Sequence, residues 1–104
     1  MIHLPPKLLI VGHDSIQLRI LELLFGLRSY TAISAAPGLD AYVQYRSRCG
    51  HFSAVIRVDP PASDARDFVL QMRRVGFHGQ VVIANGTEML SFQWDFDYQD
   101  AIRN

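Results

Sequence analysis

The chain of 104 residues has one cysteine, no net charge and no long apolar run. Cys49 has no partner for an internal disulfide, which favours a reducing, cytoplasmic location. Ten basic residues balance ten acidic ones, so we expect no direct nucleic-acid binding by this domain. No apolar stretch approaches the roughly 20 residues of a membrane span, and the first residues lack the pattern of a signal peptide. We therefore expect no membrane contact.

The composition is that of a folded domain. Hydrophobic residues make up 49% of the chain, which supports a packed core and argues against disorder. The length suits one compact domain and is too short for two. We predict a single domain over residues 1–104.

Short apolar runs predict four strands, and they are bounded by glycine or proline. The runs cover residues 8–11, 30–35, 52–58 and 81–84. Continuous apolar runs of this length are typical of strands covered on both faces, as in parallel sheets. Gly12 ends the first run, and two prolines, Pro60 and Pro61, follow the third.

Helical periodicities lie between these runs. Asp14 or Ser15 can cap the first helix. We expect that helix to be buried over much of its girth, because its apolar residues form a wide stripe: Ile16, Leu18, Ile20, Leu21, Leu23, Leu24, Phe25 and Leu27. The stripe of the second helix is predicted to begin with Leu39, Tyr42 and Val43.

The third helix is predicted from its caps and its inner stripe. Ser63 is the expected N-cap and Gly76 the expected C-terminal cap. The inner stripe consists of Phe68, Met72 and Val75. Since strands and helices alternate with short connections, we predict an α/β sandwich with a parallel sheet.

Polar groups follow three of the predicted strands. In parallel sheets, sites form at the carboxyl ends of the strands, at the switch point of the topology. The residues expected there are Gly12, His13, Asp14, Arg57 and Asn85.

The order of these elements resembles the receiver domain of bacterial two-component response regulators. Residues 7–11 look like its first strand, and residues 55–61 like the strand that carries the phosphorylated aspartate, with the family's proline following. Residues 65–73 continue that register, and residues 81–86 look like the fourth strand and the residues after it. The resemblance implies a flavodoxin-like, three-layer sandwich with five parallel strands in the order 2-1-3-4-5. We expect the family's last helix to be missing or truncated, so that this chain is either the N-terminal module of a longer protein or an unusually short receiver.

The residues that carry receiver chemistry are replaced in this chain. Gly12 and His13 occupy the positions of the acidic pair, which leaves Asp14 from the acidic cluster. Arg57 falls where the resemblance places the phosphoacceptor, and Asn85 where it places a hydroxyl residue. Arg103 or Asn104 stands where the closing lysine is expected.

These replacements predict a site without catalysis, metal or cofactor. Mg²⁺ requires oxygen ligands in near-octahedral geometry, and a permanently charged guanidinium would repel it. A lone His13 has no second histidine or cysteine at metal-ligand spacing. We therefore expect no phosphorylation and no enzyme activity.

A buried cation needs a partner. Asp14 and Asp59 are the expected carboxylates for Arg57. In a second, less favoured register Asp59 itself is the phosphoacceptor, but proline then follows it directly and the next helix falls out of step.

Alternating aromatic residues near the end of the chain can fill the core or form a contact surface. They are Phe92, Trp94, Phe96 and Tyr98. The resemblance favours a pseudo-receiver that acts in signalling or transcription control as a homodimer, through a protein partner or through a downstream effector domain. The alternative is a sensory module that binds a small anion or nucleotide around Arg57.

Overall fold

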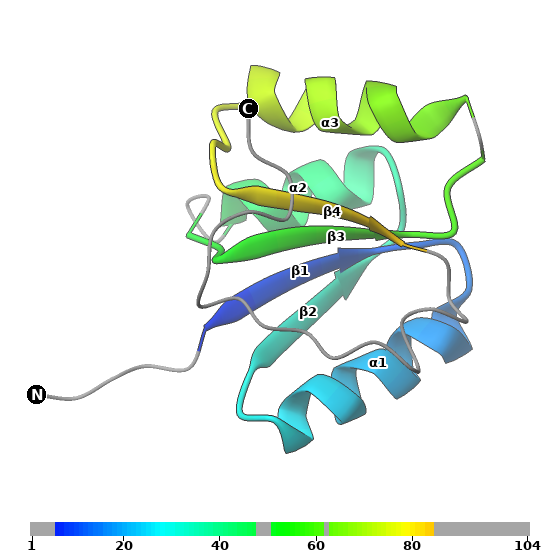
Figure 1. Ribbon diagram of the computed structural model, residues 1–104, viewed down its shortest axis with the longest axis vertical. Coiled ribbons are helices and arrows are strands. Elements are labelled where there is room, and N and C mark those ends of the chain that lie inside the picture. The colour runs from blue at the N-terminus through cyan, green and yellow to red at the C-terminus, as the bar shows by residue number, and fades with distance from the viewer. Residues whose placement is uncertain (1–5, 48–50, 62, 85–104) are drawn as a thin grey trace, which may run out of the picture.

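Strands and helices alternate along the chain in the computed structural model, which describes residues 6–47, 51–61 and 63–84 (Figure 1). In chain order the elements are β1 (Lys7–Val11), α1 (Ser15–Leu27), β2 (Thr31–Ala35), α2 (Leu39–Ser47), β3 (Ala54–Val58), α3 (Asp64–Arg74) and β4 (Gln80–Ala84). The four predicted strands and three predicted helices are confirmed, with shifts of one or two residues where the strands begin.

The four strands form one sheet in the order β2-β1-β3-β4. Every neighbouring pair is parallel, and Val11 of β1 is paired with both Ala35 of β2 and Arg57 of β3. The parallel α/β class is therefore confirmed, and this order is compatible with a flavodoxin-like fold. The expected fifth strand falls outside the described residues.

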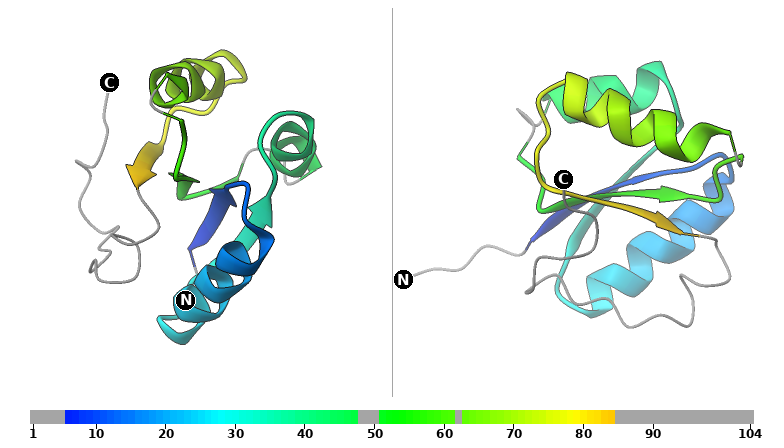
Figure 2. Two further views of the ribbon diagram at one scale, coloured as in Figure 1. Left: turned by 90° about the vertical axis from the view of Figure 1, so that its right-hand side faces the viewer. Right: turned by 45° about the horizontal axis from the view of Figure 1, so that its top comes forward.

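The helices cover the two faces of the sheet unequally. Figure 2 shows α1 on one face and α2 and α3 together on the other. Side chains of β1 alternate between the two resulting cores: Leu8 and Ile10 pack on the α1 side, and Leu9 and Val11 on the α2/α3 side. This alternation is what strand geometry requires of a strand covered on both faces.

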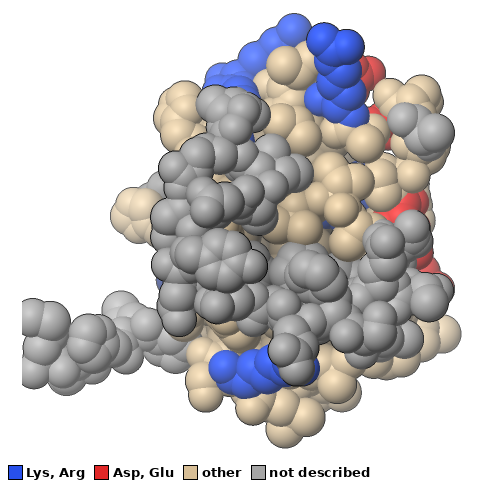
Figure 3. All heavy atoms as spheres, viewed as in Figure 1, with Lys and Arg blue, Asp and Glu red and all other residues tan. Residues whose placement is uncertain are grey.

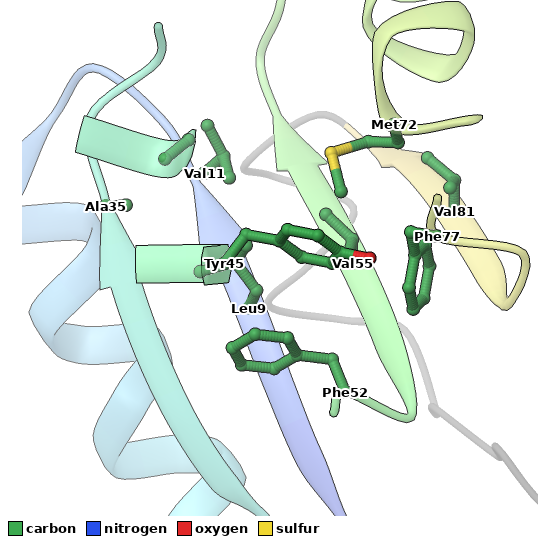
Figure 4. Close-up of a cluster of buried hydrophobic side chains, with 10 residues drawn as sticks. Leu9, Val11, Ala35, Tyr45, Phe52, Val55, Met72, Phe77 and Val81 are labelled. Atoms are coloured by element: carbon green, nitrogen blue, oxygen red, sulfur yellow. The ribbon is translucent and has the colours of Figure 1, made fainter. Parts of the chain in front are cut away.

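The core on the α2/α3 side is built around aromatic rings (Figure 4). Tyr45 of α2 stacks on Phe52 at a centroid distance of 6.3 Å and meets Phe77 edge-on at 6.1 Å. Met72 of α3 and Val81 of β4 close the same cluster. These contacts join α2, α3 and the sheet into one packed layer.

The prediction that α1 is buried over much of its girth is wrong. Its buried residues are Leu18, Leu21 and Phe25. The other apolar residues of the stripe are exposed: Ile16, Ile20, Leu23, Leu24 and Leu27. A helix that lies on one side of a sheet buries only the face toward the sheet, and apolar periodicity cannot tell that face from a second apolar face opposite.

The predicted stripe of α2 is also wrong. Leu39, Tyr42 and Val43 are exposed, and the helix buries Ala41 and Tyr45 instead. Ala41 and Tyr45 belong to the core on the α2/α3 side, so this is the face that α2 turns toward the sheet.

The inner face of α3 is as predicted. Met72 is buried, and Phe68 and Val75 pack against the same cluster. Gly76 has a φ of +98°, the left-handed conformation of a helix-terminating glycine. The expected cap by Ser63 is wrong: this residue precedes the helix, but its side chain makes no capping hydrogen bond, and its backbone is already helical.

Charged groups lie mainly at the periphery of the view in Figure 3, with basic atoms at the top and bottom and acidic atoms along one edge. Within the described ranges, no helix combines the length and apolar character needed to cross a membrane.

Candidate functional site

The loops after β1 and β3 meet at the carboxyl edge of the sheet. Gly12 follows β1 directly, and its amide donates to the carbonyl of Ala35 at 3.1 Å. A Cβ atom on Gly12 would lie 3.2 Å from Cδ2 of Leu18 and 3.5 Å from Cβ of Val58. The missing side chain therefore lets this loop lie close to both α1 and the end of β3.

Arg57 is the buried cation of this edge, with only 3% of its surface exposed. Its Nη1 donates to the carbonyl of Val58 at 3.0 Å, and its Nη2 lies 3.5 Å from Nε2 of His13. The ring of Phe68 lies 5.9 Å from Cζ, within the range of a cation–π interaction. The guanidinium is therefore held between the strand end, the loop after β1 and α3.

Burial lowers the pKa of Arg57, while the carboxylates of Asp64 and Asp59 act in the opposite direction. Even so, a guanidinium stays protonated at any working pH. Of the two carboxylates expected to pair with this cation, Asp59 acts on it electrostatically. Asp64, at the start of α3, was not foreseen from the sequence.

Asp14 serves a different purpose at this edge. Its Oδ1 accepts hydrogen bonds from the amides of Ile16 and Gln17, at 3.0 and 3.1 Å. This is the geometry of a helix N-cap, so the first of the two caps considered for α1 is confirmed. The carboxylate is committed to the exposed amides of α1.

Asp59 connects three elements from a strained backbone position. Its φ is +49°, although proline follows it, and such conformations cost about 1–3 kcal/mol. Its amide donates to the carbonyl of Ala84 at 2.8 Å, and its Oδ2 accepts from Nε2 of Gln17 at 3.2 Å. The residue thus ties the end of β3 to β4 and α1. That it could accept a phosphoryl group stays a prediction.

A pocket of about 270 Å³ opens beside this edge, between the ends of β1 and β2. Its lining consists of Gly12, His13, Ser15, Leu18, Arg19, Ser34, Ala35, Ala36 and Asp40. Asp40 accepts from the amide of Ala36 at 2.8 Å, and the hydroxyl of Ser34 donates to the carboxylate of Glu22. The lining therefore offers one cation, Arg19, and the imidazole of His13, and it does not include Arg57.

The structure brings together only part of the set predicted from the sequence. Gly12, His13 and Arg57 lie at one edge, with Asp14 on the adjoining helix end. The remaining predicted residues lie outside the described part of the chain: Asn85, Phe92, Trp94, Phe96, Tyr98, Arg103 and Asn104. Among the described residues, no group of three or more histidine, cysteine or acidic side chains could hold a metal ion.

Phe68 and Asp64 are the members of the site that the sequence did not reveal. They lie four residues apart on α3, and i, i+4 residues share one face of a helix. That spacing, together with an arginine late in the preceding strand, is the signal that could have found them.

No protein-family model, curated protein or solved structure matches this chain. What is established is a parallel α/β sheet in the order β2-β1-β3-β4 with an arginine buried at its carboxyl edge.

Proposed function

We propose that this chain is a pseudo-receiver: a regulatory module of bacterial signalling or transcription control that acts through protein contacts and accepts no phosphoryl group. The observation that carries the proposal is the buried guanidinium of Arg57, held by Val58, His13 and Phe68 where the receiver resemblance places the phosphoacceptor. The observed strand order is compatible with the receiver framework.

The charge of Arg57 argues against Mg²⁺ at this edge. Two unit charges 4 Å apart interact by about 4 kcal/mol at an effective dielectric constant of 20, and a divalent ion doubles that value. Mg²⁺ also needs several oxygen ligands, but Gly12 offers no side chain and His13 offers an imidazole. Asp14 already caps α1.

Phosphoryl labelling tests the proposal. The protein is incubated with acetyl phosphate, or with beryllofluoride, in excess Mg²⁺, and the intact mass and the ¹⁹F spectrum are recorded. We expect no adduct. An adduct on the wild type that disappears in Asp59→Asn would overturn the proposal and establish Asp59 as the acceptor.

A gain-of-function series separates the contributions to the site. Arg57→Asp alone is expected to bind no Mg²⁺ by calorimetry, because the loop after β1 still lacks the acidic pair. Adding His13→Asp supplies a second carboxylate at the same edge and is expected to give the first measurable binding. Tight Mg²⁺ binding by Arg57→Asp alone would contradict the argument.

A second candidate function is a sensory module for a small anion or nucleotide. The pocket beside His13 favours it, because Arg19 and the imidazole line a cavity of about 270 Å³. Calorimetric titration with phosphate and with nucleotides tests this function. Saturable heat that is lost in Arg19→Gln would support it, and loss in Arg57→Ala would move the site to the strand edge. Absence of heat leaves the pseudo-receiver proposal in place.

A further inference from the structure

Helix α1 has two apolar faces. The inner face, Leu18, Leu21 and Phe25, packs on the sheet. The opposite face we call the outer stripe. Its members and their exposed fractions are Ile16 (72%), Ile20 (45%), Leu23 (65%), Leu24 (39%) and Leu27 (83%). Five large aliphatic side chains on one exposed helix face form a contiguous patch of the kind that marks an interaction site.

The spacing of the outer stripe fits a helical partner. Ile16, Ile20, Leu23 and Leu27 follow one another at intervals of four, three and four residues, the spacing of apolar residues where two helices pack along each other. A helix that lies on a membrane carries a basic polar face. In α1, by contrast, Arg19 is the sole basic residue between Ser15 and Leu27.

A glycine beside the outer stripe supports close packing by another helix. Gly26 is exposed, and a Cβ atom built on it would meet nothing within 4 Å. Glycine within a helix costs about 0.5–1 kcal/mol relative to alanine, and no contact within the described structure explains that cost. The distance between packed helices depends on the side chains at the contact, so a glycine there permits a short one.

We propose that the occupant is a second copy of this chain, packed with α1 antiparallel to α1 about a two-fold axis. In that arrangement the outer stripe is complementary to itself, since Ile16 meets Leu27 of the second copy and Ile20 meets Leu23. Because such an interface uses the same surface of both chains, it produces a dimer to which no third chain can add through that surface.

Charge favours the antiparallel direction. The exposed Asp14 at the start of each α1 comes beside the exposed Arg28 at the end of the other, and the two helix dipoles oppose each other favourably. A parallel pair would instead place Asp14 against Asp14 and Arg28 against Arg28.

The size of the patch predicts a weak dimer. A stable interface buries about 800 Å² on each partner, and five partly exposed side chains of one short helix supply only part of that area. We therefore expect a weak dimer that forms only at high protein concentration. The inference deepens the proposed contact-based function, yet the two can fail separately. Phosphoryl labelling tests the site at the strand edge, whereas the molecular mass in solution tests the contact through α1.

Sedimentation equilibrium of the full chain tests the proposal over about 10 µM to 1 mM, a range that brackets such a weak interface. The wild type should move from monomer toward dimer mass, and Leu23→Gln should weaken association about tenfold or more. Leu70→Gln on α3 is the matched control, because Leu70 is 44% exposed and α3 covers the face of the sheet opposite α1 (Figure 2); it should behave as wild type. Urea midpoints that match the wild type exclude unfolding as the cause.

Three outcomes would overturn the proposal. The wild type stays monomeric at 1 mM, Leu70→Gln weakens association as much as Leu23→Gln does, or Leu23→Gln lowers the stability of the monomer. The last would mean that another part of the same chain covers the outer stripe.

A spin-label distance checks the direction of packing. Nitroxide labels are placed on Ser15→Cys in a Cys49→Ser background. In the antiparallel dimer the two labelled helix ends lie about 20 Å apart, the length of a 13-residue helix. Two labels side by side, about 10 Å apart, would contradict the antiparallel arrangement.

Discussion

The guanidinium Nη2 of Arg57 lies 3.5 Å from Nε2 of His13, so the cation at the end of β3 reaches the loop that follows β1. The same group donates to the carbonyl of Val58 and lies over the ring of Phe68. Three parts of the chain thus meet at one side chain, which makes Arg57 a structural element of the edge as well as a charge.

Shortening Arg57 should cost more stability than removing its charge. Arg57→Ala leaves a cavity beside Phe68 and should lower the free energy of unfolding by about 2–4 kcal/mol. Arg57→Met retains most of the stem and removes a desolvated cation, which offsets the lost hydrogen bond, so its cost should stay within about 1 kcal/mol. Urea unfolding measures both. If Arg57→Met lost as much as Arg57→Ala, the charge itself would be what holds the edge.

Asp14 should contribute as a helix cap and not as a partner of Arg57. Asp14→Ala should lower the free energy of unfolding by about 1 kcal/mol, while Asp14→Ser should retain most of it. In a double-mutant cycle with Arg57→Met, the coupling energy should be within about 0.5 kcal/mol of zero. A larger coupling energy would show that the Asp14 carboxylate also interacts with the Arg57 guanidinium.

Arg73 should stabilise the connection from α3 to β4. Its Nη1 donates to the carbonyls of Phe77 and Gly79, both at 2.9 Å. Arg73→Ala should therefore cost about 2–3 kcal/mol, because hydrogen bonds from a charged group are the stronger kind. The neighbouring Arg74 is exposed, so Arg74→Ala should stay within about 0.5 kcal/mol of wild type. Equal losses in thermal or urea unfolding would contradict this account.

Two glycines should respond to alanine in opposite directions. A Cβ atom on Gly79 would lie 2.7 Å from Cζ of the buried Phe77, so Gly79→Ala should destabilise by about 1–3 kcal/mol. Gly26 has open space around it, so Gly26→Ala should stabilise the chain by about 0.5–1 kcal/mol at concentrations that keep it monomeric. Both values come from chemical denaturation, and a neutral Gly79→Ala would show that Phe77 can move aside.

Much of the sheet could be predicted because three of its strands, β1, β3 and β4, are mostly apolar. The apolar runs of β1 and β3 are buried on both faces and that of β4 is at least partly buried, so no choice between faces was needed. For each helix, by contrast, the prediction has to choose which face is buried. Both faces of α1 are apolar, so the sequence pattern does not indicate which face is buried. The packing of the helix on the sheet buries Leu18, Leu21 and Phe25.

Only one part of the candidate site could be predicted, namely the residues that the strand order alone brings together. Val11 and Arg57 are register partners, so the loops that follow them had to meet. The contact with Phe68 and the electrostatic effect of Asp64 depend on how α3 crosses the sheet, which local patterns do not specify. The sequence also could not decide whether Asp14 caps α1 or pairs with Arg57. In the structure its carboxylate accepts hydrogen bonds from the first amides of α1.

The outer stripe of α1 has a consequence for how this chain can change over time. Water touches those five side chains both before and after folding, so they add little to the free energy that holds the domain together. Mutations can therefore replace these aliphatic residues, and so change the binding partner of the helix, without preventing the domain from folding.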